Sequence, residues 1–247
     1  MAEPDPPLSL LDNAALFLDF DGTLVELAEA PDAIRVSPGL APLLKRLLNR
    51  LEGRLALVTG RSIGGLERHL SCSGIAVSGS HGLELRLADG RALPVPVRHD
   101  LGPARERLGR LAQEVPGLLV EDKPFGVALH YRRAPEQGER VADMMTALAG
   151  QSGLEVQKGK MVIELRPPGA DKGDAVRAFM MEPDFAGARP LFIGDDMTDE
   201  HAFAAAADLG GAGILVGPPR PTAAKWRLNN VAAVTDWLSR ATEERDA

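Results

Sequence analysis

The chain has 247 residues, of which 45% are hydrophobic, so it is long and apolar enough to bury a large core. Its formal net charge of -7 argues against a nucleic acid as partner, because contact with a phosphate backbone needs a basic face. Cys72 is the single cysteine, which excludes an intramolecular disulfide and a structural zinc site rich in thiolates.

The first predicted element is a buried strand that ends in an acidic motif, LFLDFDGTL, at residues 16–24. Asp19 and Asp21 stand one residue apart at its end, ahead of Gly22, which lets the chain turn away. Because side chains alternate along an extended chain, the backbone must bend for both carboxylates to reach one pocket. In such a pocket one carboxylate can attack phosphorus, its neighbour can transfer protons, and Mg²⁺ can screen the substrate's charge. The alternative is an ordinary strand followed by an acidic turn.

A helix and a second strand are predicted next. Ser37 and Pro38 are typical of an N-cap and a first helical residue, and leucines at helical spacing follow until Gly53. The apolar run at residues 55–58 predicts a strand that ends at Thr59, just before another helix. The hydroxyl of Thr59 is therefore expected at the same sheet edge as the two aspartates.

A third strand is predicted at residues 75–77, followed by the polar loop at residues 79–82, which contains His81. Alternating leucines then indicate a hairpin whose turn is Asp89–Gly90. The repeated alternation of strand and helix predicts a parallel sheet with right-handed connections. Ligands bind at the carboxyl edge of such a sheet.

The pattern changes near Arg98, which we interpret as a domain boundary. A helical stripe followed by two short strands occurs twice before the chain returns to the first pattern at residues 166–169. This repeat predicts a compact sheet covered on one face by two helices, an arrangement that suits a lid. The expected helices are at residues 101–115 and 141–148, and the expected strands at 118–121, 126–131, 154–156 and 161–165.

A second acidic cluster follows the linker. Lys172 opens a helix, and the strand at residues 191–193 runs directly into the sequence GDDMTDE at residues 194–200. Thr198 is a candidate N-cap for the next helix, with acidic residues in its first turn, but a cap does not explain Asp195 and Asp196.

The last part of the chain is expected to complete the same sheet. Residues 214–216 predict another strand. We expect Trp226 and Trp237 to lie on helices that close the sheet.

Four strand and helix ends thus carry groups suited to phosphate chemistry. A phosphate dianion cannot approach two carboxylates unless positive charge and hydrogen-bond donors compensate it. Lys172 supplies the charge and Thr59 a donor, while backbone N–H groups after Asp19 can hold the remaining oxygens. The order and types of these groups resemble the four motifs of the haloacid dehalogenase-like hydrolases, and Asp21 resembles the second aspartate of their phosphatases.

This resemblance implies an α/β fold, with a Rossmann-like parallel-sheet core at residues 1–97 and 169–247. It also implies a smaller inserted α+β cap (αββαββ) at residues 98–168, between the second and third motifs. The implied mechanism is attack by Asp19, acid and base catalysis by Asp21, and support from Thr59 and Lys172. The implied cofactor is Mg²⁺, held by Asp19, the carbonyl of Asp21, and Asp195, with Asp196 and Asp199 in supporting roles.

Strings in both predicted domains resemble the trehalose-6-phosphate phosphatase family, although that family more often has serine where Thr59 stands. They are residues 58–61, 79–84, 120–123, 130–132, 160–167 and 194–200. The resemblance implies hydrolysis of trehalose 6-phosphate in trehalose biosynthesis. The residues implied to bind the substrate are Gly22, Gly60, Arg61, His81, Glu121, Lys123, Lys160, Glu164 and Arg166.

Other interpretations remain open for these residues. Glu121 and Lys123 also fit an exposed hairpin pair, His81 a hydrogen-bonded loop residue, and His130 a core or packing residue. Two other functions fit the chain as a whole. One is a phosphatase of another sugar phosphate, such as sucrose 6-phosphate or a mannosylglycerate phosphate. The other is a non-catalytic sugar-phosphate sensor.

The expected partner is a small sugar phosphate, with neither nucleic acid nor membrane. The most apolar stretch, residues 202–216, is broken by Asp208 and by glycines, and residues 1–12 lack the pattern of a signal peptide. We therefore expect a cytoplasmic protein. A monomer is expected, and the sequence does not exclude an oligomer.

Overall fold

The computed structural model describes residues 6–27, 34–94, 100–123, 125–159, 161–168 and 171–243. The chain divides into two compact units, each described by itself below. The core unit is Met1–Pro94 with Ala170–Ala247, and the inserted unit is Val95–Gly169.

The core unit is built on a central sheet, which has seven strands in the described residues, in the order β11-β10-β9-β1-β2-β3-β4. All neighbouring strands are parallel except β3 and β4. Strands β1 and β2 are buried along their whole length, as expected of apolar runs covered on both faces. The strands are β1 (Ala14–Leu18), β2 (Leu55–Val58), β3 (Ala76–Gly79), β4 (Glu84–Arg86), β9 (Arg189–Gly194), β10 (Ala212–Val216) and β11 (Trp226–Leu228).

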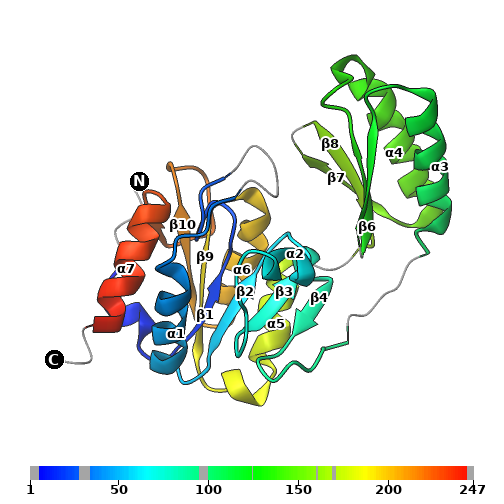
Figure 1. Cartoon of the computed structure of the whole chain (residues 1–247). Helices are drawn as coiled ribbons and strands as arrows, with labels where there is room; N and C mark the ends of the chain where they lie inside the picture. The colour runs from blue at the N-terminus through cyan, green and yellow to red at the C-terminus, as the bar shows by residue number, and fades with distance from the viewer. Residues whose placement is uncertain are drawn as a thin grey trace. The chain divides into compact units, whose positions relative to one another are not determined.

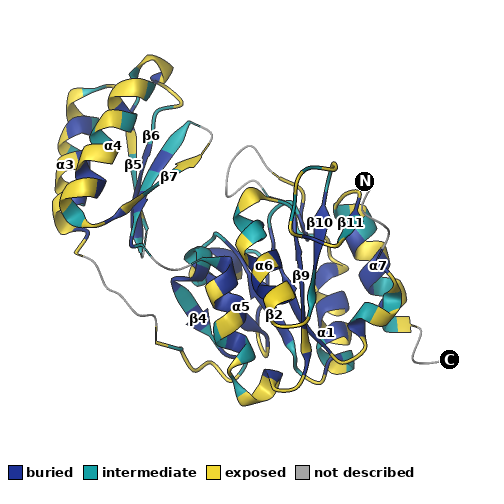
Figure 2. Ribbon diagram, turned by 180° about the vertical axis from the view of Figure 1, so that it is seen from behind, coloured by how far each residue is buried: buried dark blue, intermediate teal, exposed yellow. Residues whose placement is uncertain are grey.

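Helices cover both faces of this sheet. Helices α1 and α7 pack together over one face, and α5 and α6 pack together over the other (Figures 1 and 2). On the second face Phe17 of β1 stacks against Phe185, with ring centroids 5.8 Å apart, and Phe179 of α5 joins them. The α-helices are α1 (Leu40–Arg50), α2 (Ile63–Glu67), α5 (Lys172–Met180), α6 (Glu200–Asp208) and α7 (Val231–Glu243), and the short 3₁₀ helices are η1 (Leu8–Leu11), η3 (Ser80–Gly82), η5 (Pro183–Phe185) and η6 (Met197–Asp199).

The inserted unit has an antiparallel sheet with strand order β5-β6-β8-β7, counted over its described residues. Helices α3 and α4 lie on one face of this sheet (Figure 2), where Leu108, Met145 and Leu165 are buried in a common core. The unit comprises α3 (Gly102–Glu114), β5 (Leu119–Lys123), β6 (Gly126–His130), η4 (Pro135–Gln137), α4 (Gly138–Ser152), β7 (Glu155–Gly159) and β8 (Val162–Arg166). By strand alternation, the face that the helices leave open carries Glu121, Lys123, Glu164 and Arg166.

The predicted fold class, a parallel-sheet α/β core with a smaller αββαββ unit, is confirmed. Within the described ranges, no helix combines the length and the apolar character needed to cross a bilayer.

Two local predictions are wrong. Helix α1 begins at Leu40 after Gly39, not at Pro38 after a Ser37 cap, because the Ser37 hydroxyl accepts a hydrogen bond from the Gly39 N–H (3.3 Å) in the turn before the helix. Trp226 lies in strand β11 rather than in a helix, because it pairs in parallel with Ile214 of β10 and extends the sheet. Pairing between distant segments decides this strand, and local propensity does not reveal it.

Candidate active site

Chemically active side chains meet where three parallel strands of the core sheet end. Asp19 follows β1, Thr59 follows β2 and Asp195 follows β9, and β1 is hydrogen-bonded to both other strands. Lys172 joins them from the first turn of α5, which is fixed by an N-terminal capping box between Asp171 and Asp174.

Lys172 is buried between two carboxylates. Its Nζ donates to Asp19 Oδ1 at 2.7 Å and to Asp199 Oδ1 at 2.6 Å. All three side chains are at most 4% exposed. Burial alone would lower the pKa of Lys172, but the two carboxylates outweigh burial and raise it, so the ammonium stays charged.

The carboxylates carry more negative charge than Lys172 neutralises. Burial raises the pKa of Asp19 well above its usual value, and repulsion from Asp199 and Asp195 adds to this against the attraction of Lys172. Burial and then repulsion from Asp199 raise the pKa of Asp195 to about 6. When all three carboxylates of this cluster are ionised, one ammonium leaves two negative charges uncompensated.

A divalent cation fits this cluster. Among the described residues, Asp19, Asp195 and Asp199 each offer a carboxylate oxygen, and these oxygens lie within 4.8 Å of one another. The donors are all oxygen atoms, which Mg²⁺ prefers, and a double positive charge would balance the excess. Asp199 is already engaged, because one oxygen binds Lys172 and the other accepts from the Asp196 N–H at 2.8 Å. Asp19 and Asp195 are therefore the side chains best placed to hold a cation.

Asp21 has a different partner. Arg61 Nε and Nη2 donate to the two oxygens of Asp21, each at 2.7 Å, and the guanidinium lies 5.9 Å from the ring centroid of Phe20. The Arg61 N–H also donates to Thr59 Oγ1 at 3.1 Å, so the loop after β2 is tied to the carboxylate after β1. Both oxygens of the predicted acid and base are thus engaged by a cation.

Two of the predicted glycines allow close approach around the site. Gly22 has a φ of 83°, and a Cβ added there would lie 2.1 Å from Asp195 Oδ2. A Cβ added at Gly60 would lie 2.5 Å from the His81 ring. His81 itself has a φ of 56°, an uncommon backbone conformation for a non-glycine residue, and its N–H donates to the Thr59 carbonyl at 3.1 Å. The structure therefore places His81 against the loop after β2.

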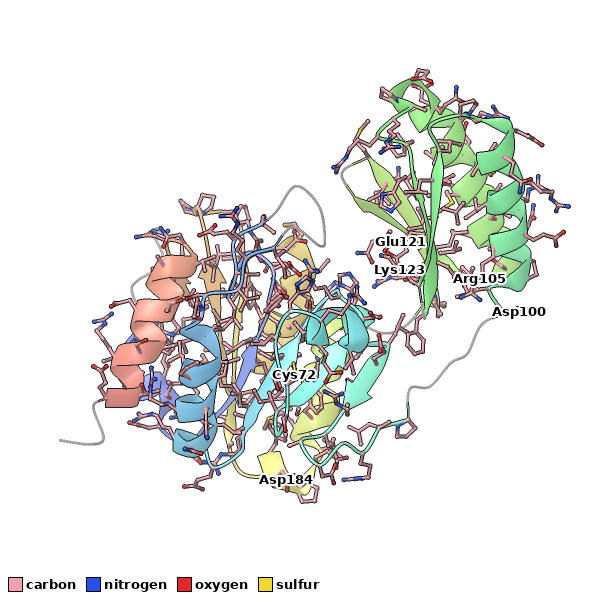
Figure 3. The ribbon with its side chains drawn as sticks, in the orientation of Figure 1. Cys72, Asp100, Arg105, Glu121, Lys123 and Asp184 are labelled. Carbon is pink, nitrogen blue, oxygen red and sulfur yellow. The ribbon has the colours of Figure 1, made fainter. Side chains whose placement is uncertain are left out.

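The described substrate-binding candidates of the inserted unit share the open face of its sheet. Figure 3 shows Glu121 and Lys123 on one side of the sheet, away from Arg105 of α3. Ala128 of β6 pairs with Glu121 on one side and with Glu164 on the other, so the two glutamates lie on the same face. Arg166 lies two residues further along β8 and shares this face. Lys160, the remaining candidate, lies outside the described residues.

Contacts between charged or polar side chains cross this open face from strand to strand. Lys123 pairs with Glu164, and Glu121 Oε2 lies 2.7 Å from His130 Nε2. Glu121 and Lys123 do not pair with each other, and His130 is 32% exposed rather than a core residue. Arg166 lies 3.9 Å from Glu155.

The predicted cap of the second acidic cluster is wrong. Asp196, not Thr198, closes the cap, because Asp196 is extended and its side chain accepts from the Met197 N–H at 2.6 Å, while Asp199 accepts from the Asp196 N–H. Thr198 lies inside η6. Asp196 thus shapes the loop, while Asp199 also holds Lys172.

Sequence reasoning missed two groups that contact Asp195. Thr23 Oγ1 donates to Asp195 Oδ1 at 3.4 Å, and Arg220 Nη2 lies 3.4 Å from the Asp195 carbonyl. Thr23 belongs to the first acidic motif, and its hydroxyl was the available signal. Arg220 lies in a proline-rich segment between β10 and β11, with no sequence signal.

The chain matches a known protein family over most of its length. The trehalose-phosphatase family model matches residues 17–232. A probable trehalose-phosphate phosphatase from Sinorhizobium fredii is 44% identical over 85% of this chain and 80% of its own length. The trehalose-6-phosphate phosphatase of Escherichia coli is 37% identical over 98% of this chain and 92% of its own length.

A solved structure shares the fold. The C-terminal domain of trehalose-6-phosphate phosphatase from C. albicans superposes with a TM-score of 0.77 at 24% identity, over 98% of both chains.

Proposed function

The chain belongs to the trehalose-phosphatase family, and from this premise we propose that it hydrolyses trehalose 6-phosphate to trehalose and inorganic phosphate. The observation that carries the proposal is the buried ammonium of Lys172 between Asp19 and Asp199, at the ends of the central strands. This arrangement fixes a carboxylate at a sheet edge where a phosphoryl group can bind.

Asp19 is the proposed nucleophile. Its carboxylate oxygen forms a bond to phosphorus as the bond from phosphorus to the sugar oxygen breaks, and Asp21 gives the leaving oxygen a proton. Asp21 then takes a proton from a water molecule, which attacks phosphorus and releases phosphate from Asp19. Because Arg61 donates to both oxygens of Asp21, one of these two hydrogen bonds has to break before Asp21 can exchange a proton with the leaving oxygen or with water.

Mg²⁺ is the proposed cofactor, and it would neutralise charge on the phosphoryl group. Asp19 and Asp195 would hold it with their carboxylates, and by resemblance the main-chain carbonyl of Asp21 would complete the set. Lys172 and the hydroxyl of Thr59 would bind the phosphoryl oxygens.

The inserted unit is the proposed specificity domain. Its open face alternates carboxylates and cations, which suits a neutral disaccharide rich in hydroxyl groups. We assign substrate contacts to Glu121, Lys123, Glu164 and Arg166 there, and to Lys160. In the core unit we assign them to Gly22, Gly60, Arg61 and His81. A cytoplasmic location and a monomeric state remain predictions.

A panel of sugar phosphates tests the proposal. With Mg²⁺ we expect kcat/KM for trehalose 6-phosphate to exceed that for sucrose, glucose and mannosylglycerate phosphates by at least about tenfold, because hydrogen-bonding sites discriminate strongly. Treatment with a chelator should abolish phosphate release, and added Mg²⁺ should restore it. Full activity in chelated protein would refute the metal, a preference for another sugar would refute the substrate, and no release from any would favour the sensor.

Variants of the open face test the role of the inserted unit. Glu121→Ala, Lys123→Ala and Glu164→Ala should each lower kcat/KM for trehalose 6-phosphate, because each removes a hydrogen bond to the sugar. The loss of transition-state stabilisation that corresponds to this decrease should be about 1 to 3 kcal/mol. Hydrolysis of p-nitrophenyl phosphate should hardly change, since an aryl phosphate lacks these contacts.

Asp122→Ala is the matched control for these variants. Asp122 lies on β5 with Glu121 and Lys123, but its side chain pairs with Arg105 of α3 at 2.5 Å. It should leave both substrates unaffected. Equal losses on both substrates for the three test variants would mean that their residues support folding or chemistry. No loss on either substrate would mean that these residues are ordinary surface charges without a role in substrate binding.

A further inference from the structure

An arginine that no recognised motif contains holds the acidic loop after β9. Arg220 lies between β10 and β11, and its Nη2 donates to the main-chain carbonyls of Asp196 at 2.9 Å and Asp195 at 3.4 Å. Its Nη1 donates to Glu200 at the start of α6. The side chains of Arg220 and Glu200 are 21% and 19% exposed, so the contact is mostly shielded from water.

Glu200 fixes the segment that carries this arginine. Its Oε2 accepts from the Ala223 N–H at 2.8 Å and from Thr222 Oγ1 at 3.1 Å, while Oε1 binds Arg220. Thr222 Oγ1 in turn accepts from the Ala224 N–H at 3.0 Å. The β10–β11 segment, the start of α6 and the loop after β9 are therefore connected through one ion pair.

We propose that Arg220 is a positioning residue for the divalent-cation site, acting through Asp195, an inference that rests on the proposed Mg²⁺ dependence. Two successive carbonyls accept from one nitrogen of the guanidinium, which restrains the peptide planes that follow Asp195. The restraint keeps the Asp195 carboxylate directed at Asp19 rather than free to rotate with its loop. Arg220 binds neither the ion nor the substrate in this role.

The charge of Arg220 alone would have the opposite effect. A guanidinium near the acidic cluster repels a divalent cation, so its removal should strengthen cation binding if charge were all that mattered. Loss of a positioning contact should weaken binding instead, because partners that orient metal ligands typically contribute roughly 10- to 100-fold in metal affinity. The sign of the change distinguishes the two effects.

Direct Mn²⁺ binding to the whole protein, followed by electron paramagnetic resonance without substrate, measures that sign. Arg220→Gln should raise the Mn²⁺ dissociation constant about tenfold. Arg220→Lys should also raise it, because a single ammonium keeps the charge but does not reproduce the planar guanidinium that bridges Glu200 and the carbonyls. In steady-state assays, both variants should need more Mg²⁺ while kcat at saturating Mg²⁺ stays within about threefold of the unchanged protein.

Arg177→Gln is the matched control. It removes an equal charge from the core unit, at an exposed ion pair with Asp208, and should leave the Mn²⁺ dissociation constant unchanged. Urea unfolding of each variant checks that the fold is retained. Unchanged or tighter Mn²⁺ binding by folded Arg220→Gln would overturn this inference and leave the proposed function untouched. If the unchanged protein bound no Mn²⁺, the proposed metal would fail and the inference with it.

Discussion

Asp19→Asn should abolish turnover, lowering kcat by at least about 10³-fold, because an amide cannot form the acyl phosphate that splits the reaction into two steps. The substitution is nearly isosteric, and Lys172 keeps its hydrogen bond to Asp199. The core unit should therefore remain folded. Phosphate release from trehalose 6-phosphate measures the loss, and acid quenching followed by mass spectrometry measures phosphate attached to residue 19.

Asp12→Asn is the control for this variant. Asp12 precedes the same strand, but its side chain is 61% exposed and pairs with Arg50 rather than with the site, so its neutralisation should leave kcat unchanged. Residual activity of Asp19→Asn above about 1% of the unchanged rate, or a quenched phosphate found on another residue, would refute the nucleophile assignment.

Lys172→Met should remove activity and destabilise the core unit together. Without the ammonium, Asp19 and Asp199 face each other while almost fully buried, and breaking a buried ion network in this way typically costs about 3–5 kcal/mol. The free energy of urea unfolding measures the stability. Phosphate release at saturating Mg²⁺ measures the activity.

A second substitution separates the two effects of Lys172. The double variant Lys172→Met/Asp199→Asn removes one of the two facing charges, so part of the stability should return while activity should not. Lys225→Met controls for the loss of a positive charge, because Lys225 is exposed beside the Trp226 ring and should matter little to either measurement. A stable, active Lys172→Met protein would contradict both assignments.

The strand ends of the site were predictable from local sequence. Continuous apolar runs define β1, β2 and β9 as buried parallel strands, and the residues that follow them must then meet at one edge of the sheet. Asp19, Thr59 and Asp195 follow from that rule alone. Lys172 was assigned from the positive charge that a phosphate site needs, because nothing local says that the first turn of α5 reaches the end of β1.

The partners of these residues were not predictable. Arg61 and its partner Asp21 are 40 residues apart in the chain, and Arg220 and its partner Asp196 are 24 residues apart. Both contacts depend on side-chain directions that tertiary packing sets. The cap after β9 failed for a related reason. Asp196 and Thr198 are both good capping residues, and only the extended backbone at Asp196 selects between them.

The insertion of one unit into the other has a consequence for how the chain folds. Strand β1 is made early, but one of its two neighbours, β9, is made only after the whole inserted unit has been synthesised. The inserted unit is contiguous in sequence, so its contacts close short loops, whereas the pairing of β1 with β9 closes a very long one. We therefore expect the inserted unit to fold first during translation, while the apolar strand β1 still lacks its partner β9. During that interval the edge of β1 that faces β9 is unpaired, which makes it a site for aggregation and for chaperone binding.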